Sequence, residues 1–308
     1  MYTNEEKIIM WLTSFDFMTY KKAKRLIETI DNLEEMFNNM SKYKSTLDKI
    51  FDKNELDELL SNNNLVYIDR CIDNYEKLGI KVVTIKSEDY SDLLKEIPSY
   101  PILLYCMGDT KLLNSVCLGV VGSRRATKYG VTCGSQIVKD VAINNITIVS
   151  GLAEGIDTMA HKACLDVHGK TIAVLGGGLL NIFPSSNKVL AKNILESGGL
   201  IISEYKPNEP CIAYHFPVRN RIIAGLSKGV FVVEATEKAE VCTPKTLPLI
   251  LIVKFLQCQQ ELTIYIQTGV TKSFEMVKHV WFLVLRILLS SLENHTLSQK
   301  KKKWHKCP

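Results

Sequence analysis

Residues 116–130 read VCLGVVGSRRATKYG, and this stretch decides the fold. The apolar run Val116–Val121 predicts a buried strand, and the turn GSRR at 122–125 ends it. A helical pattern follows over residues 127–143. A strand, a glycine turn and a helix in this order direct free backbone N–H groups toward an anion. The two arginines of the turn add positive charge suited to a phosphate.

Taken alone, this turn leaves two interpretations open. It is not the usual dinucleotide-binding fingerprint, because only Gly119 and Gly122 fall near that pattern and no third glycine opens the helix. An ordinary tight turn with solvated arginines would show the same residues. The rest of the chain has to decide between an anion site and a plain turn.

Composition excludes several classes of protein. The 308 residues are 46% hydrophobic, which is enough for a large core and two domains. The net charge of +5 permits a nucleic-acid partner without requiring one. The nine cysteines form no CxxC pair, so we expect no zinc site and no disulfide framework. We also expect no cofactor. The N-terminus is acidic where a signal peptide is basic, and the apolar runs are about half the roughly 20 residues of a spanning helix; we expect a cytoplasmic protein.

The chain divides into three parts. Residues 1–63 carry apolar positions at helical spacing and predict a small helical domain, which either serves interaction or simply packs on its neighbour. Residues 64–238 predict an α/β domain, and residues 239–308 form an aberrant tail.

The α/β domain alternates apolar strands with amphipathic helices. The predicted strands are Val116–Val121, Ile146–Ser150, Thr171–Leu175, Leu200–Glu204 and Val230–Glu234. The predicted helices are Tyr129–Ile143, Ile156–Val167, Asn187–Glu196 and Asn220–Leu226. This alternation predicts a doubly wound, mostly parallel sheet covered on both faces. Right-handed crossovers then bring the carboxyl ends of the strands to one edge.

Glycines, cations and aromatic residues follow these carboxyl ends. The turn after the first strand holds Gly122, Ser123, Arg124 and Arg125, and the later loops hold Gly151, Gly176–Gly178, Phe183, Lys188, Phe216, Arg219 and Arg221. Packing could explain any one loop, but several such loops at one edge favour a groove for a phosphate-bearing ligand.

Five ordered segments resemble the DNA-processing protein A (DprA/Smf) family. They read GVVGSRRATKYG, ITIVSGLAEGIDTMAHKACL, KTIAVLGGGLLNIFPSSNKVLAK, GLIISEY and HFPVRNRIIAGLSKGVFVVEA. With LLKEIPSYPILLYCMGD upstream, the likeness spans about Asp89 to Lys238. The resemblance implies an extended Rossmann-like domain and a non-enzymatic protein. Such proteins bind single-stranded DNA, help load RecA recombinase in natural transformation, and act as homodimers.

The same resemblance implies roles for individual residues. Gly122, Ser123 and Arg124, with Arg125 beside them, would hold a DNA phosphate, and Lys188 would be a second cationic contact. Phe216 is the first choice for stacking on a base, and Phe183 is the second. Arg219 and Arg221 would be further basic contacts or supports for the pocket, with Asn220 between them. Backbone amides near Gly151 and Gly177 would complete it. Simpler roles stay open, since Asn220 could cap the last helix and Phe183 could plug the sheet edge.

The likeness to the family ends after Lys238, and a frameshift accounts for the change. With permitted codons, the DNA behind Glu240–Thr246 can encode Ser-Val-Tyr-Thr-Glu-Asn-Ala in another frame. In that same frame, the DNA behind Val253–Gln259 can encode Lys-Ile-Phe-Ala-Val-Pro. Both of these alternative-frame peptides are typical of the family. We therefore predict that residues 239–308 are out-of-frame translation, which impairs activity and the dimer contacts that the resemblance places there.

Two other functions stand beside DNA binding, of which only the first competes with it. A Rossmann-like nucleotide phosphoribohydrolase would need a GGxGT-type loop, but here the three glycines 176–178 are followed by LLNIFP. An adaptor that works through the N-terminal helices is compatible with DNA binding and stays open.

Overall fold

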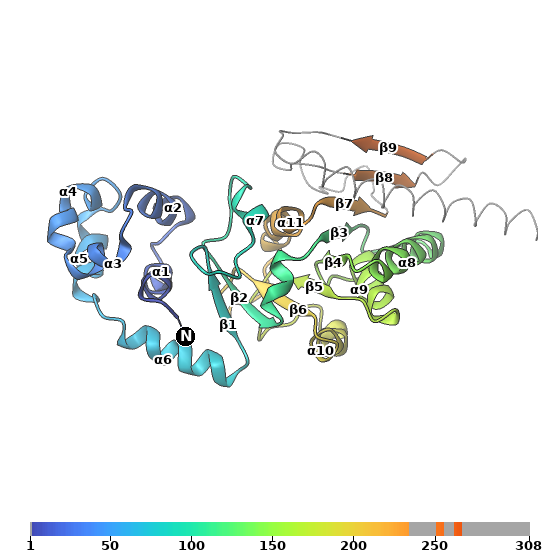
Figure 1. Cartoon of the computed structure of the whole chain (residues 1–308), viewed down its shortest axis with the longest axis horizontal. Coiled ribbons are helices and arrows are strands. Elements are labelled where there is room, and N and C mark those ends of the chain that lie inside the picture. The colour runs from blue at the N-terminus through green and yellow to red at the C-terminus, as the bar shows by residue number, and fades with distance from the viewer. Residues whose placement is uncertain (1, 234–250, 256–261, 267–308) are drawn as a thin grey trace, which may run out of the picture.

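The structure is a computed structural model that describes residues 2–233, 251–255 and 262–266 (Figure 1). Its N-terminal part is helical, as predicted. The helices are α1 (Asn4–Ser14), α2 (Tyr20–Thr29), α3 (Leu33–Asn38), η1 (Met40–Tyr43), α4 (Lys44–Leu47), α5 (Lys53–Ser61) and α6 (Val66–Lys77). Polar side chains fix where they begin: Thr3 and Asp52 each form a capping box with the glutamate three residues later.

A single sheet forms the rest of the fold. Its described strands are β1 (Lys81–Thr84), β2 (Leu103–Gly108), β3 (Cys117–Val121), β4 (Thr147–Ser150), β5 (Thr171–Val174), β6 (Leu200–Ser203), β7 (Gly229–Val232), β8 (Leu251–Phe255) and β9 (Leu262–Ile266). The order is β1-β2-β6-β5-β4-β3-β7-β8-β9. Neighbours from β6 to β8 pair in parallel, whereas β1, β2 and β9 pair antiparallel. The predicted mostly parallel sheet is confirmed.

Helices cover both faces of this sheet (Figure 1). They are α7 (Asp92–Lys95), η2 (Thr110–Asn114), α8 (Lys128–Ile143), α9 (Ile156–Asp166), η3 (Ser185–Asn187), α10 (Lys188–Glu196) and α11 (His215–Leu226). The side chains of α8 and α9 form one core with Leu118 and Val120 of β3. The side chains of α11 join a second core with Cys117 and Val121, which point to the opposite face of the same strand. The fold is therefore doubly wound.

The helical part shares the second core with the sheet. Buried residues from Ile8 in α1 to Val232 in β7 belong to one continuous apolar cluster. At the boundary, the Tyr2 hydroxyl accepts a hydrogen bond from the Val82 amide at 2.8 Å, and the Tyr20 hydroxyl donates to the Pro98 carbonyl at 2.8 Å. Of the two roles that the sequence left open for the N-terminal helices, the structure supports packing on the neighbouring domain.

One predicted boundary is wrong. The sequence placed residues 215–219 in a loop, yet α11 already begins at His215. Pro217 is compatible with this earlier start, because proline is tolerated in the first turn of a helix, where its missing N–H would have no intrahelical partner. Asn220 consequently lies inside α11 and does not cap it.

The predicted out-of-frame segment falls mostly outside the described residues. Within 239–308 only β8 and β9 are described; β8 pairs with β7, and β9 pairs with β8. The frameshift stays a prediction.

Candidate nucleic-acid interface

The turn that opens the site is fixed by its neighbours. The Ser123 hydroxyl accepts a hydrogen bond from the Arg125 amide at 3.0 Å, and Thr127 caps α8 by accepting from the Gly130 amide at 3.0 Å. The amide of Ile156, the first residue of α9, donates to the Ser123 carbonyl at 3.2 Å. These hydrogen bonds thus fix the turn relative to the starts of α8 and α9.

Gly155 allows this close approach of the two loops. Its φ is +78°, and a Cβ atom there would collide with the carbonyl oxygens of Ser123 and Arg124. Both features require glycine. The approach leaves the Arg124 and Arg125 side chains exposed at the carboxyl edge, where they can meet a ligand.

Three predicted binding residues come together at this edge. The Arg124 guanidinium lies 5.1 Å from the centre of the Phe216 ring, which is cation–π geometry. The Phe183 ring lies 5.8 Å from the Phe216 ring at an angle of 48°, and Phe183 is 53% exposed. We call Arg124, Phe183 and Phe216 the carboxyl-edge cluster. They are far apart in the sequence and meet because their loops follow parallel strands.

Arg219 lies beneath this cluster and is only 3% exposed. Its Nη1 donates to the carbonyl oxygens of Gly151 and Val174, and its Nη2 lies 3.4 Å from Oδ2 of Asp157, which is also buried. Its guanidinium carbon lies 6.0 Å from the centre of the Phe216 ring. Of the two roles predicted for Arg219, the geometry favours support of the pocket, because a buried guanidinium cannot reach a DNA phosphate.

Two further predicted contacts are engaged within the protein. Arg221 forms an ion pair with Glu204, and their side chains are 20% and 16% exposed. Burial raises the pKa of Glu204, and the charge of Arg221 opposes this shift. Asn220 accepts a hydrogen bond from Nε of Arg219 at 3.0 Å. Both residues therefore act as supports in this structure.

At the glycines of these loops, other residues of the protein occupy the space that a side chain would need. A methyl group at Gly151 would overlap the Arg219 guanidinium, and one at Gly177 would overlap Cys211. At Gly122 it would lie 2.7 Å from the Ile156 side chain. The sequence predicted close approach of a ligand at these glycines, whereas the structure accounts for them by internal packing.

Lys188 is the first residue of α10 and is exposed. The preceding Asn187 is buried and donates to the Leu152 carbonyl at 2.8 Å and to the Thr158 hydroxyl at 2.8 Å. These bonds join the residue before α10, next to Lys188, to the loop after β4 and to α9. Among the described residues, no carboxylate forms an ion pair with Arg124, Arg125 or Lys188.

One exposed aromatic residue at this edge was not predicted from the sequence. Tyr214 immediately precedes α11 and is 75% exposed. Next to it, the rings of Tyr205 and His215 stack with their centres 3.8 Å apart. The available signal was the position of Tyr214 beside the HFPVRNR segment. In the part of the chain that is described, no helix is long and apolar enough to cross a bilayer, and no cluster of potential metal ligands occurs.

Comparison with known proteins identifies the family. The sequence model of the family described as DNA recombination-mediator protein A matches residues 81–241. The chain belongs to this family. The match covers the whole carboxyl edge described above and confirms the resemblance found in the sequence.

Relatives within the family agree with this assignment. Protein Smf of Escherichia coli is 47% identical over 154 residues, which cover 50% of this chain and 41% of that protein. DNA processing protein DprA of Bacillus subtilis is 37% identical over 188 residues, or 61% of each chain. The match to DprA of Streptococcus pneumoniae, 46% identical over 142 residues, covers 50% of that protein. The chain thus matches between 41% and 61% of the length of these family members.

A solved structure supports the fold. The X-ray structure of DNA processing protein A from Streptococcus pneumoniae matches with a TM-score of 0.56 and 32% identity, and the match covers 76% of this chain and 79% of that one. The two proteins therefore share a fold over the matched part of each chain.

Proposed function

We propose that this protein binds single-stranded DNA at the carboxyl edge of its sheet and acts, without catalysis, as a recombination mediator. The carboxyl-edge cluster is the observation that carries the proposal. In it, a guanidinium lies beside two aromatic rings, one of which is more than half exposed. Among the described residues, this guanidinium has no carboxylate partner. The family description and the names of the relatives, which refer to recombination and DNA processing, support it.

The cluster fits an unpaired strand better than a duplex. The rings of Phe183 and Phe216 can stack only on a base whose face is free, and in a duplex those faces are covered by neighbouring base pairs. Arg124 would contact the adjacent phosphate, with Lys188 further along the backbone. Because charge follows the backbone and an aromatic ring accepts any base, the strand is bound with little sequence preference.

Affinity for a fluorescent oligothymidylate, measured across a salt series, tests the proposal. Arg124→Ala should weaken binding about tenfold or more, because a hydrogen bond to a charged group contributes roughly 1.5–3 kcal/mol. The slope of log K against log salt should fall by about 0.7 for each lost phosphate contact.

Lys170→Ala is the matched control. Lys170 is exposed and immediately precedes β5, at the amino end of the strands and opposite the cluster. If both variants lower the affinity equally, general charge and not the cluster holds the strand. An unchanged affinity of Arg124→Ala would refute the site.

Delivery of the bound strand to RecA recombinase is the second part of the proposal. It rests on family membership and is tested by RecA assembly on DNA precoated with single-strand-binding protein. We expect faster assembly with the wild-type chain than with Arg124→Ala.

We expect homodimerisation, which the family resemblance implies, to be weakened if residues 239–308 are out of frame.

The competing nucleotide enzyme has a direct test of its own. Release of ribose 5-phosphate from nucleoside monophosphates by the purified chain would favour the phosphoribohydrolase.

A further inference from the structure

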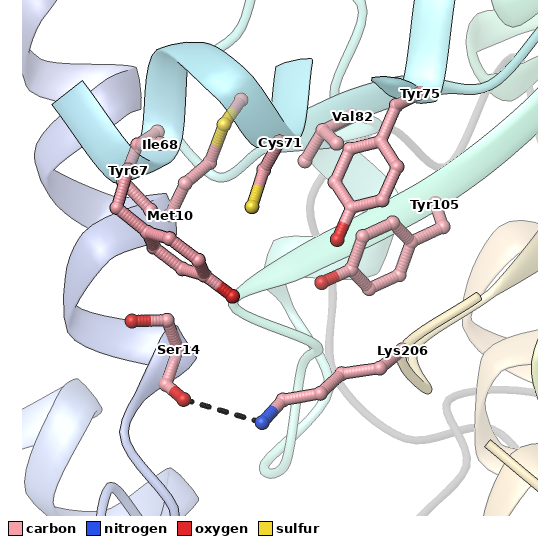
Figure 2. A pocket seen from close by; sticks show the side chains of 9 residues that line it. All are labelled: Met10, Ser14, Tyr67, Ile68, Cys71, Tyr75, Val82, Tyr105 and Lys206. Atoms are coloured by element: carbon pink, nitrogen blue, oxygen red, sulfur yellow. Dashed lines mark hydrogen bonds between the residues drawn. The ribbon is translucent and has the colours of Figure 1, made fainter. Parts of the chain in front are cut away.

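A cavity of about 70 Å³ lies between the helical part and the sheet (Figure 2). Its walls come from α1, α6, β1, β2 and the loop after β6. None of its lining residues belongs to the carboxyl-edge cluster. The cavity is therefore a separate feature from the proposed DNA site.

Several polar groups that can donate hydrogen bonds line this cavity. The lining includes the hydroxyls of Tyr67, Tyr75 and Tyr105 and the ammonium of Lys206, and it contains no aspartate or glutamate. Figure 2 shows the hydroxyls of Tyr67 and Tyr105 pointing toward one another, with Lys206 nearby. Tyr105 is 8% exposed. Such a lining disfavours a cation and suits an anion.

The present partners of these donors are easily exchanged. Nζ of Lys206 lies 3.1 Å from Asp16, whose side chain is 99% exposed, and an ion pair in water contributes little. The same Nζ donates to the Ser14 carbonyl at 3.2 Å. Tyr75 and Tyr105 pack edge to face, with their ring centres 5.6 Å apart.

Burial keeps the two inner tyrosines protonated. It raises the pKa of Tyr105 and also that of Tyr75, each of which lies against the other. Nearby Glu209 raises the pKa of Tyr105 further. At neutral pH both side chains are therefore neutral phenols that can donate to a ligand.

We propose that this cavity binds a phosphate group, with Lys206 and the tyrosine hydroxyls as its donors. The cavity offers roughly five times the space that one water molecule needs, which matches the five heavy atoms of phosphate. The phosphate would be either free inorganic phosphate or the terminal phosphate of a DNA end. Neither inorganic phosphate nor a terminal DNA phosphate needs to bind the carboxyl-edge cluster in order to occupy this cavity.

Isothermal titration of the full chain with inorganic phosphate at low ionic strength tests the site. We expect saturable binding that Lys206→Met weakens about tenfold or more, because the charged donor is lost. Tyr105→Phe, which removes one buried hydroxyl, should weaken it severalfold. Lys170→Met is the control, since Lys170 is also an exposed lysine that donates to a backbone carbonyl, that of Ser197 at 2.7 Å.

Near-ultraviolet circular dichroism verifies that each variant is folded. Lys206 is half exposed, so its substitution spares the core even if Tyr105→Phe unfolds the chain. Absence of saturable phosphate binding, or equal binding by wild type and Lys206→Met, overturns the proposal.

Oligonucleotides with and without a 5′-phosphate distinguish the two sources once the site is shown with inorganic phosphate. Tighter binding of the phosphorylated strand, abolished by Lys206→Met, identifies a DNA end. Equal binding of the two strands identifies free phosphate as the ligand. Either result supports the site.

Discussion

Replacement of Arg219 by methionine is the most direct perturbation of the framework under the carboxyl-edge cluster. Methionine keeps the apolar stem, but the buried carboxylate of Asp157 loses its ion-pair partner, and the carbonyl oxygens of Gly151 and Val174 lose their donor. Leaving one member of a buried ion pair uncompensated costs about 3–5 kcal/mol. We expect Arg219→Met to lower the free energy of unfolding by that amount.

A double-mutant cycle isolates the cause. In Asp157→Asn/Arg219→Met the unpaired charge is gone, so the double variant should be more stable than the sum of the single losses predicts, by about 0.5–3 kcal/mol. Urea denaturation at pH 7, followed by circular dichroism, measures all four chains. A loss below about 1 kcal/mol for Arg219→Met, or strict additivity in the cycle, would show that this buried pair does not hold the loops together.

Four further predictions concern the DNA site, a buried histidine and the reading frame. Phe216→Leu should weaken single-stranded DNA binding by about 1–3 kcal/mol through lost stacking while leaving the salt slope unchanged; Lys188→Ala should instead lower the slope by about 0.7. His161 is fully buried and donates from Nδ1 to the Thr171 hydroxyl, and burial lowers its pKa to about 3. Because the unfolded chain takes up a proton near pH 6.5, stability should fall by about 2 kcal/mol between pH 7 and pH 5; a urea series in which His161→Gln keeps that dependence would contradict this. Sequencing codons 236–262 checks the frameshift, and the hypothesis is rejected if neither alternative frame encodes a family-like tail.

Much of the fold could be predicted because periodicity reports burial directly. Strands such as Thr171–Val174 are short and wholly apolar or β-branched, so they are recognised without knowledge of their neighbours. The beginning of α11 could not be predicted, because Pro217 resembles a loop residue until the helix around it is known. The GSRR turn was correctly placed at a helix start because Thr127 caps that helix locally.

The candidate site was predicted only in part, because the burial of a side chain depends on residues that lie far apart in the chain. Arg124 and Arg219 look alike in the sequence, yet one is exposed and the other buried. Nothing local separates them, since the burial of Arg219 depends on Asp157 and on the carbonyls of Gly151, which follows β4, and of Val174, which ends β5. The cavity around Tyr105 was missed altogether, because its walls come from segments far apart in the chain.

The amino-acid sequence by itself determined the alternation of strands and helices, the edge at which the loops meet, and the family. These properties depend on local periodicity and on ordered motifs, both of which can be read along one dimension. Only the tertiary structure decided which arginine faces solvent, that Phe183 lies against Phe216, and that tyrosines and a lysine surround a cavity. Those outcomes depend on the crossovers between strands and on close packing, which bring together side chains that no sequence spacing relates.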